Sequence, residues 1–217
     1  YNPTLLPDAA ATAKRWREQC KKLGFEIFLL VAETHGFDSR SETWFDGLVE
    51  FPPLRRLPED KTHKHQLLNN FQGNIFSYAD LVDIHSEPQQ FEFPVFKTVS
   101  PSWDNTARRN DKATIFEGST PALYQQWLSN AIQSTICDND ESQRLVFVNA
   151  WNEWAEGAYL EPDAQYGYAY LNATAKALKK FDADQPTLIF TSHDANLGGA
   201  QNLILTLLQW LHAHTNL

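Results

Sequence analysis

The sequence predicts an α/β fold in which parallel strands alternate with helices. The first observation is a series of short apolar runs, rich in strand-forming residues, at 25–32, 47–51, 94–99 and 145–149. The second is helical spacing of apolar residues in the segments between and after them. Strand–helix–strand units place their strands in parallel. An eight-unit barrel takes roughly 250 residues, so about four such units with long connections predict the C-terminal half of a (β/α)8 TIM-like barrel.

Three helices are predicted from their ends and their spacing. Residues 8–23 begin at Asp8, a suitable N-cap, and end before Gly24, a suitable C′ residue. Residues 121–136 follow a Ser-Thr cap, and residues 166–180 carry apolar positions along one side. In the first helix we expect a buried stripe made of Ala9, Ala13, Trp16, Cys20 and Leu23.

Residues 54–92, between the second and third predicted strands, are polar and irregular, with helical patches at 61–71 and 78–85. A polar stretch with a proline at 182–187 then predicts a linker. We therefore divide the chain into a barrel unit over 1–181, the linker, and the start of a second unit over 188–217. The second unit opens with a strand at 187–191, and its helix at 200–212 carries an apolar face that needs a partner.

Composition excludes several classes of function. Apolar residues make up 42% and charged residues 21%, as in ordinary globular proteins. Eighteen basic against 27 acidic residues give a net charge of −9, which argues against a nucleic-acid partner. No apolar run is long enough to span a membrane. Because Cys20 and Cys137 form neither a disulfide framework nor a metal motif, we expect both to be reduced and buried in a cytoplasmic protein.

The chain contains no methionine and begins at Tyr1, which we interpret as a fragment of a longer protein. His63 and His65 could ligate a metal, but no third ligand is visible, so a solvated loop is the better interpretation. We therefore expect no metal site and no cofactor.

The segment richest in candidate catalytic and binding residues is 149–163, which directly follows a predicted buried strand. In parallel α/β folds the loops after such strands build active sites. Carboxylates, amides and aromatic rings are concentrated here, as in sugar-binding sites, and the candidate substrate-binding residues are Trp151, Asn152, Trp154 and Tyr159.

Glu153 and Glu156 are the candidate catalytic residues. On a helical turn, side chains three apart lie about 5–6 Å from each other, and glycoside chemistry uses a carboxyl pair at about that separation. The alternative is a solvated helix N-terminus, where the helix dipole favours Glu. The flanking tryptophans and the position after a strand favour the catalytic interpretation.

Residues 149–157, 160–163 and 166–170, together with 45–53 and 101–109, resemble the signature of the WbsX-like glycosyltransferase family of bacterial surface-polysaccharide loci. The resemblance covers about residues 1–181. This family is related to glycoside hydrolase family 99, and the resemblance implies a (β/α)8 barrel. It also implies that Glu156 acts as general acid/base, while Glu153 assists attack by the sugar's own 2-hydroxyl through an anhydro-sugar.

The segment after the third strand supplies further candidates for sugar binding. Trp103 would stack on a sugar, Asp104 and Asn105 would bind hydroxyl groups, and Arg108 would meet an anionic group or pair with one of the two glutamates. The alternative is a capped turn, because Asp and Asn often bind their own backbone.

Residues 189–201 resemble the opening strand, glycine-rich loop and first helix of a Rossmann-like GT-B glycosyltransferase domain. Gly198 and Gly199 would let backbone N–H groups approach the diphosphate of a nucleotide-sugar donor. A tight turn also needs glycine, which is the alternative.

These observations predict a carbohydrate-active enzyme fragment that transfers sugars in bacterial O-antigen-type polysaccharide biosynthesis. Its partners would be a glycan and a nucleotide-sugar donor. The alternatives are an endo-acting hydrolase of the family 99 type and a non-catalytic glycan-binding module attached to a transferase.

Overall fold

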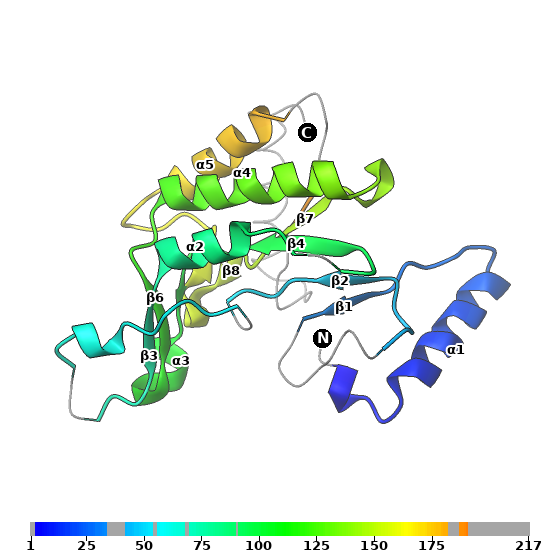
Figure 1. Ribbon diagram of the computed structural model, residues 1–217, viewed down its shortest axis with the longest axis horizontal. Helices are drawn as coiled ribbons and strands as arrows, with labels where there is room; N and C mark the ends of the chain where they lie inside the picture. The colour runs from blue at the N-terminus through cyan, green and yellow to red at the C-terminus, as the bar shows by residue number, and fades with distance from the viewer. Residues whose placement is uncertain are drawn as a thin grey trace.

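A parallel sheet of five strands runs through the centre of the structure (Figure 1). The computed structural model describes residues 3–33, 42–53, 56–67, 70–89, 91–181 and 187–190. The strand order is β1-β2-β4-β7-β10, and every neighbouring pair is parallel. These strands are β1 (Leu30–Ala32), β2 (Gly47–Val49), β4 (Val95–Val99), β7 (Leu145–Val148) and β10 (Thr187–Phe190). The predicted α/β class with a parallel sheet is therefore confirmed.

Three helices lie beside one another above the strands in Figure 1: α2 (Tyr78–Ser86), α4 (Pro121–Asp138) and α5 (Ala169–Lys179). Helix α4 is the middle one and contacts both α2 and α5 as well as β4 and β7. The main hydrophobic core fills the space between these helices and the sheet. Thr120 caps α4 by accepting a hydrogen bond from the Leu123 N–H (3.2 Å), as the sequence predicts.

The first helix, α1 (Ala9–Lys22), forms where the sequence predicts it, with Asp8 accepting a hydrogen bond from the Ala11 N–H at 2.8 Å. The predicted buried stripe is wrong, because only Ala13 of that stripe is buried and Leu23 is 75% exposed. Figure 1 shows the reason: α1 lies out to the side of β1 and β2, away from the layer of α2, α4 and α5. The predicted burial of both cysteines is also wrong, since Cys137 is exposed and Cys20 only half-buried; both are free thiols.

A second sheet, which the sequence analysis missed, joins β3 (Asn74–Ser77), β6 (Thr114–Glu117) and β5 (Trp103–Asp104). β3 pairs with β6 in parallel, and β5 pairs with β6 antiparallel. These strands belong to the connections that follow β2 and β4, so they extend the carboxyl side of the main sheet. Of the helical patch predicted at 61–71, the described residues form only the 3₁₀ turn η2 (Thr62–Lys64).

Short elements complete the described part of the chain. α3 (Thr106–Arg109) and η3 (Asn110–Lys112) link β5 to β6, while η1 (Pro3–Leu5) and η4 (Glu141–Gln143) precede α1 and β7. A hairpin of β8 (Asn152–Glu153) and β9 (Ala158–Tyr159) follows β7, with the 3₁₀ turn η5 (Trp154–Glu156) between its strands. No helix among the described residues is long and apolar enough to cross a bilayer.

Strand β10 was predicted to open the second unit. In the structure it pairs in parallel with β7, with Thr187 opposite Leu145, and so extends the main sheet. Residues 182–186 and 191–217, which include Gly198 and Gly199, lie outside the described residues. The division at 182–187 and the phosphate-binding role of these glycines therefore stay predictions.

Glu50, Lys97 and His85 of α2 are polar side chains that lie largely buried near one another. The Lys97 ammonium is 2.7 Å from the Glu50 carboxylate, and both side chains are largely withdrawn from water. His85 is buried nearby, its ring 5.4 Å from that of Trp127. Burial lowers the pKa of His85 to about 3, and the positive charges of Arg56 and Lys97 act in the same direction. The imidazole is therefore neutral at physiological pH.

This histidine predicts a specific pH dependence of stability. Because its folded-state pKa is below the unfolded value of 6.5, the unfolded chain binds the extra proton between the two values. His85 thus contributes stability fully above about pH 6.5 and loses it as the pH falls toward 3, by at most about 1.4 kcal/mol per pH unit. Urea unfolding at several pH values should give a shallower decline for His85→Phe than for the wild type. The control Leu23→Phe, at an exposed position without a titratable group, should keep the wild-type slope; equal slopes for both variants would contradict the assignment.

A matched leucine pair tests the layer assignment. Leu128 on α4 is fully buried, whereas Leu23 at the end of α1 is 75% exposed. Leu128→Ala should lower the free energy of unfolding by about 2–5 kcal/mol through lost burial and a residual cavity. Leu23→Ala should change it by no more than about 0.5 kcal/mol. Denaturant unfolding of both variants measures the difference, and similar losses would contradict the exposed placement of α1.

Candidate active site

Segments that lie far apart in the sequence meet at the carboxyl edge of the main sheet. The Asn149 side chain, after β7, donates a hydrogen bond to the Pro52 carbonyl after β2 (3.2 Å). The Asn149 backbone N–H donates to the carbonyl of Val99, the last residue of β4 (2.8 Å). The Ser102 hydroxyl donates to the Gly157 carbonyl. Residues 45–53, 101–109 and 149–163 are therefore brought together where α/β folds place their sites.

The two candidate acids occupy a single turn of the hairpin. Glu153 ends β8 and Glu156 is the last residue of η5, and both side chains are half-buried. The helical turn expected from the sequence is one 3₁₀ turn that Glu153 precedes as its N-cap, with a backbone conformation outside the helical region (φ −79°, ψ 65°). The side-by-side placement of the two carboxyl groups therefore stays a prediction. Gly157 ends the turn with φ +61°, in the left-handed region, and its N–H donates to the Trp154 carbonyl (3.1 Å).

This turn rests directly on β5. A Cβ atom at Gly157 would lie 2.7 Å from the Asp104 nitrogen and 2.9 Å from its carbonyl oxygen. Such distances are too short for any side chain, so only glycine permits the approach. The contact fixes the position of the Glu153–Glu156 turn relative to the second sheet.

Arg108 contacts this turn from α3. Its guanidinium forms an ion pair with the Glu156 carboxylate, which is one of the two pairings that the sequence analysis considered. The Arg108 side chain is 60% exposed and that of Glu156 only 19%. The pair orients the Glu156 carboxylate from the solvent side, although a pair this exposed adds little to stability.

Asp104 and Asn105 bind the backbone, as in the alternative interpretation of this segment. Asp104 accepts a hydrogen bond from the Thr106 N–H (2.9 Å), which caps the start of α3. The Asn105 side-chain oxygen accepts from the Thr114 N–H (2.7 Å), which ties α3 to β6. These contacts give both residues a structural role, and sugar binding by either stays a prediction.

The four candidate aromatic residues fall into two groups. Trp103 and Trp151 are only 4% and 2% exposed and belong to the main core, so their burial favours packing over sugar stacking. Trp154 is 47% exposed, and its ring stacks on Tyr159 with centroids 3.8 Å apart. The Trp154 indole N–H donates to the Glu161 carboxylate (2.6 Å), which holds the ring pair beside the acids. Asn152 lies opposite Tyr159 in the hairpin and is half-buried.

A cavity of about 170 Å³ lies next to the hairpin and was not predicted from the sequence. Tyr159 is the one predicted site residue in its lining. The other lining residues are Ser102, Ser119, Asp163, Gln165, Tyr166 and Tyr170. The repeated tyrosines of residues 166–170, which contributed to the family resemblance, are the signal that could have indicated it.

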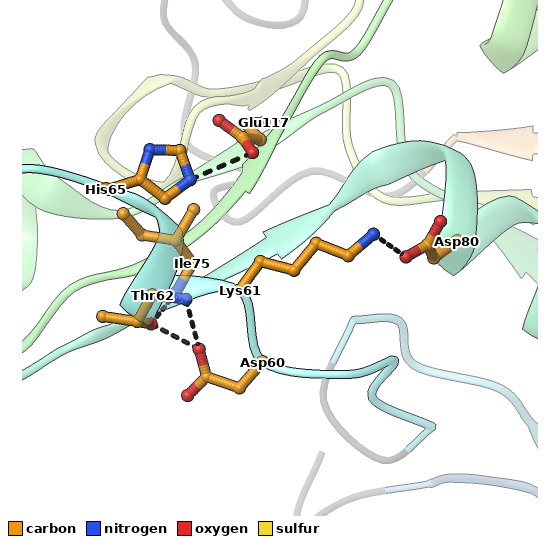
Figure 2. A network of polar contacts seen from close by, with 7 residues as sticks. All are labelled: Asp60, Lys61, Thr62, His65, Ile75, Asp80 and Glu117. Carbon is orange, nitrogen blue, oxygen red and sulfur yellow. Dashed lines mark hydrogen bonds and ion pairs between the residues drawn. The ribbon is translucent and has the colours of Figure 1, made fainter.

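His65, one of the two histidines that raised the possibility of a metal site, lies in a different polar network (Figure 2). His65 Nε2 is 3.2 Å from the Glu117 carboxylate, and Lys61 pairs with Asp80. The Thr62 hydroxyl accepts a hydrogen bond from the Ile75 N–H (2.8 Å). The network ties η2 to β3, β6 and α2. Within the described residues, no group of three or more His, Cys, Asp or Glu could hold a metal ion.

The close approach at Gly157 predicts an asymmetric effect of alanine substitution. Gly157 and Gly167 both have positive φ values, +61° and +53°, but a Cβ atom at Gly167 would meet nothing within 4 Å. Gly167→Ala should therefore cost only the left-handed backbone penalty of about 1–2 kcal/mol. Gly157→Ala should cost more, because the Asp104 backbone must also move. Thermal and urea unfolding of the two variants provide the comparison, and equal losses would contradict the packing of the turn on β5.

The sequence matches the family described as "Glycosyltransferase WbsX" over residues 1–174. Curated relatives are the proteins called "Uncharacterized protein WxcX" from two strains of Xanthomonas campestris pv. campestris, B100 and ATCC 33913. Each is 39% identical over 183 residues, covering 83% of this chain and 26% of the relative. The chain thus spans about a quarter of the length of these relatives.

A solved structure described as a "Glycoside hydrolase-like protein" has a similar fold. The TM-score is 0.51 at 17% sequence identity, over 79% of this chain and 50% of that one. At this identity the likeness concerns the fold. The family match, by contrast, covers all three segments that meet at the sheet edge and ends within α5. The chain belongs to the WbsX glycosyltransferase family.

Proposed function

We propose that this chain carries the paired-carboxylate part of a glycosyl-transfer site, within the C-terminal half of a (β/α)8 barrel. The observation that carries the proposal is the single turn that presents Glu153 and Glu156 at the carboxyl edge of the sheet, beside the half-exposed Trp154–Tyr159 stack. Family membership supports carbohydrate chemistry at this edge. The pairing of β10 with β7 favours counting residues 187–190 within the barrel sheet rather than in a separate GT-B unit.

The proposed chemistry follows from two carboxyl groups with different roles. Glu156 in its acid form donates a proton to the leaving oxygen as the bond from that oxygen to the anomeric carbon breaks. Glu153 as carboxylate takes the proton of the sugar 2-hydroxyl, whose oxygen attacks the anomeric carbon and closes an anhydro ring. An acceptor hydroxyl then gives its proton to Glu156 and opens the ring, and the 2-oxygen recovers its proton from Glu153. Such acid–base steps contribute about 10²–10⁴-fold each.

Trp154 and Tyr159 offer an aromatic surface beside the turn for the apolar face of a sugar ring. The ion pair with Arg108 favours the carboxylate form of Glu156, so in this proposal the bound sugar displaces Arg108 before Glu156 acts as the acid. Asn152, on the adjacent position of β8, would bind sugar hydroxyls. The acceptor decides the outcome: a sugar hydroxyl gives transfer, as in O-antigen-type polysaccharide assembly, and water gives hydrolysis.

Replacing the acid/base residue tests catalysis directly. Glu156→Gln keeps the shape and hydrogen-bonding capacity of the side chain but removes the proton donor. We expect turnover to fall at least about 100-fold, while glycan binding is retained. Labelled oligosaccharides incubated with the protein, with and without sugar donors, would be followed by mass spectrometry for added or released sugar units.

The control for this variant is Glu141→Gln, at an exposed carboxylate in η4 on the amino side of β7, which should leave turnover unchanged. Unchanged turnover in Glu156→Gln would contradict the catalytic proposal. Bound glycan without any turnover in the wild type would instead indicate a glycan-binding module. Free sugar released without a donor would indicate a hydrolase.

A further inference from the structure

The cavity beside the hairpin lies between elements that the rest of the fold holds in place. Ser102 follows β4, Ser119 precedes the N-cap of α4, and Tyr170 lies in the first turn of α5. Tyr159 in β9 joins the cavity to the acid-bearing hairpin, and Ser102 bonds the carbonyl of Gly157. The cavity is therefore next to the Glu153–Glu156 turn but lined by different residues.

The lining of this cavity combines hydroxyl, amide and carboxylate groups with the rings of Tyr159, Tyr166 and Tyr170. Serine and tyrosine hydroxyls can donate and accept hydrogen bonds, whereas the Asp163 carboxylate only accepts. A ligand must therefore offer several donors, as a sugar ring does. The lining contains no lysine or arginine, so an anion such as phosphate would face Asp163 without a compensating charge. This composition selects a neutral, hydroxylated ligand.

The polar groups are held in place by one another. The Tyr159 hydroxyl donates to Asp163 (3.1 Å), the Ser119 and Tyr170 hydroxyls are 2.7 Å apart, and the Tyr166 hydroxyl donates to the Ser119 carbonyl (3.4 Å). The rings of Tyr166 and Tyr170 meet edge to face, with centroids 5.4 Å apart. Aromatic walls with fixed hydroxyls match the mixed apolar and polar faces of a sugar ring.

Tyr159 and Tyr170 keep their protons at physiological pH. Burial raises the pKa of Tyr170 to about 12, and burial together with Asp163 raises the pKa of Tyr159. Tyr159 donates its hydrogen bond to Asp163, and because Ser119 donates to the Pro101 carbonyl, Tyr170 is the donor in its contact with Ser119. The two tyrosine oxygens are therefore left as acceptors for the hydroxyl protons of a ligand. The volume of about 170 Å³ is below the roughly 300–1,000 Å³ of pockets for drug-sized ligands, so it suits a single ring.

We propose that this cavity is a subsite for one neutral sugar unit of the glycan, adjacent to the paired carboxylates. Asp163 and Tyr166 would be its main hydrogen-bonding residues, and neither was a candidate in the sequence analysis. The link to the reacting sugar rests on the proposed function above. Binding at the subsite itself can be measured independently of turnover.

The test uses the 217-residue chain with methyl glucoside, methyl mannoside and methyl galactoside as probes, measured by ligand-observed NMR titration. Asp163→Asn keeps an acceptor for the Tyr166 N–H but removes the charge, and Tyr166→Phe removes one hydroxyl. We expect at least one probe to bind, with affinity reduced about three- to tenfold in each variant.

The matched control is Tyr168→Phe, two residues from Tyr166 on the same segment, exposed and outside the lining. It should leave the affinity unchanged, and melting curves would show that all variants are folded. Equal losses in Tyr166→Phe and Tyr168→Phe, no binding of any probe, or preferential binding of inorganic phosphate would each overturn the subsite.

Glu156→Gln separates the two proposals. It should lose turnover but keep probe affinity, so unaltered turnover refutes the catalytic role without touching the subsite.

Discussion

The contact between the main chains of Gly157 and Asp104 is the constraint on which the geometry of the site depends. It joins the hairpin after β7 to the second sheet, two parts of the chain that the sequence separates by about 50 residues. The Asp104 side chain is engaged in capping α3, which leaves its backbone as the surface on which the turn rests. The same β5–α3 segment carries Arg108, so one contact sets both the position of Glu156 and the approach of its partner. Backbone packing therefore places the turn that carries the acids, and the ion pair with Arg108 orients the Glu156 carboxylate.

Some elements of this fold could be predicted from the sequence, and others could not. Helix α4 was predictable because a cap, a proline in the first turn and a long apolar face agree. Strands β4 and β7 were predictable because both are short segments rich in β-branched and aromatic residues. Helix α1 has the same local signals, but its environment was not predictable, because helical spacing identifies an apolar face without showing what covers it.

The second sheet escaped prediction for a different reason. Strands β3, β5 and β6 have two to four residues each, too few for an alternating pattern to emerge. β3 and β6 are stabilised by pairing between segments about 40 residues apart, and local propensity contains no information about such a pair. The site was affected in the same way: the spacing of Glu153 and Glu156 was visible in the sequence, but the burial of Trp103 and Trp151 was not. A tryptophan beside a catalytic acid looks the same in sequence whether its ring faces the core or a ligand.

Hydroxyl groups of buried tyrosines form hydrogen bonds with the loops at the sheet edge. These hydrogen bonds explain how the loops hold a defined geometry. The fully buried Tyr78 donates to the carbonyl of Ser100 at 2.6 Å and so holds the chain just after β4. Ser119 binds Tyr170 and thereby joins the beginnings of α4 and α5. Side chains locked by packing position a site more accurately than loops alone. One framework thus supports two neighbouring surfaces, an ion-paired acid turn and a tyrosine-lined cavity that contains the Asp163 carboxylate. A saccharide that spans both would have its reacting bond positioned by a ring that takes no part in the reaction.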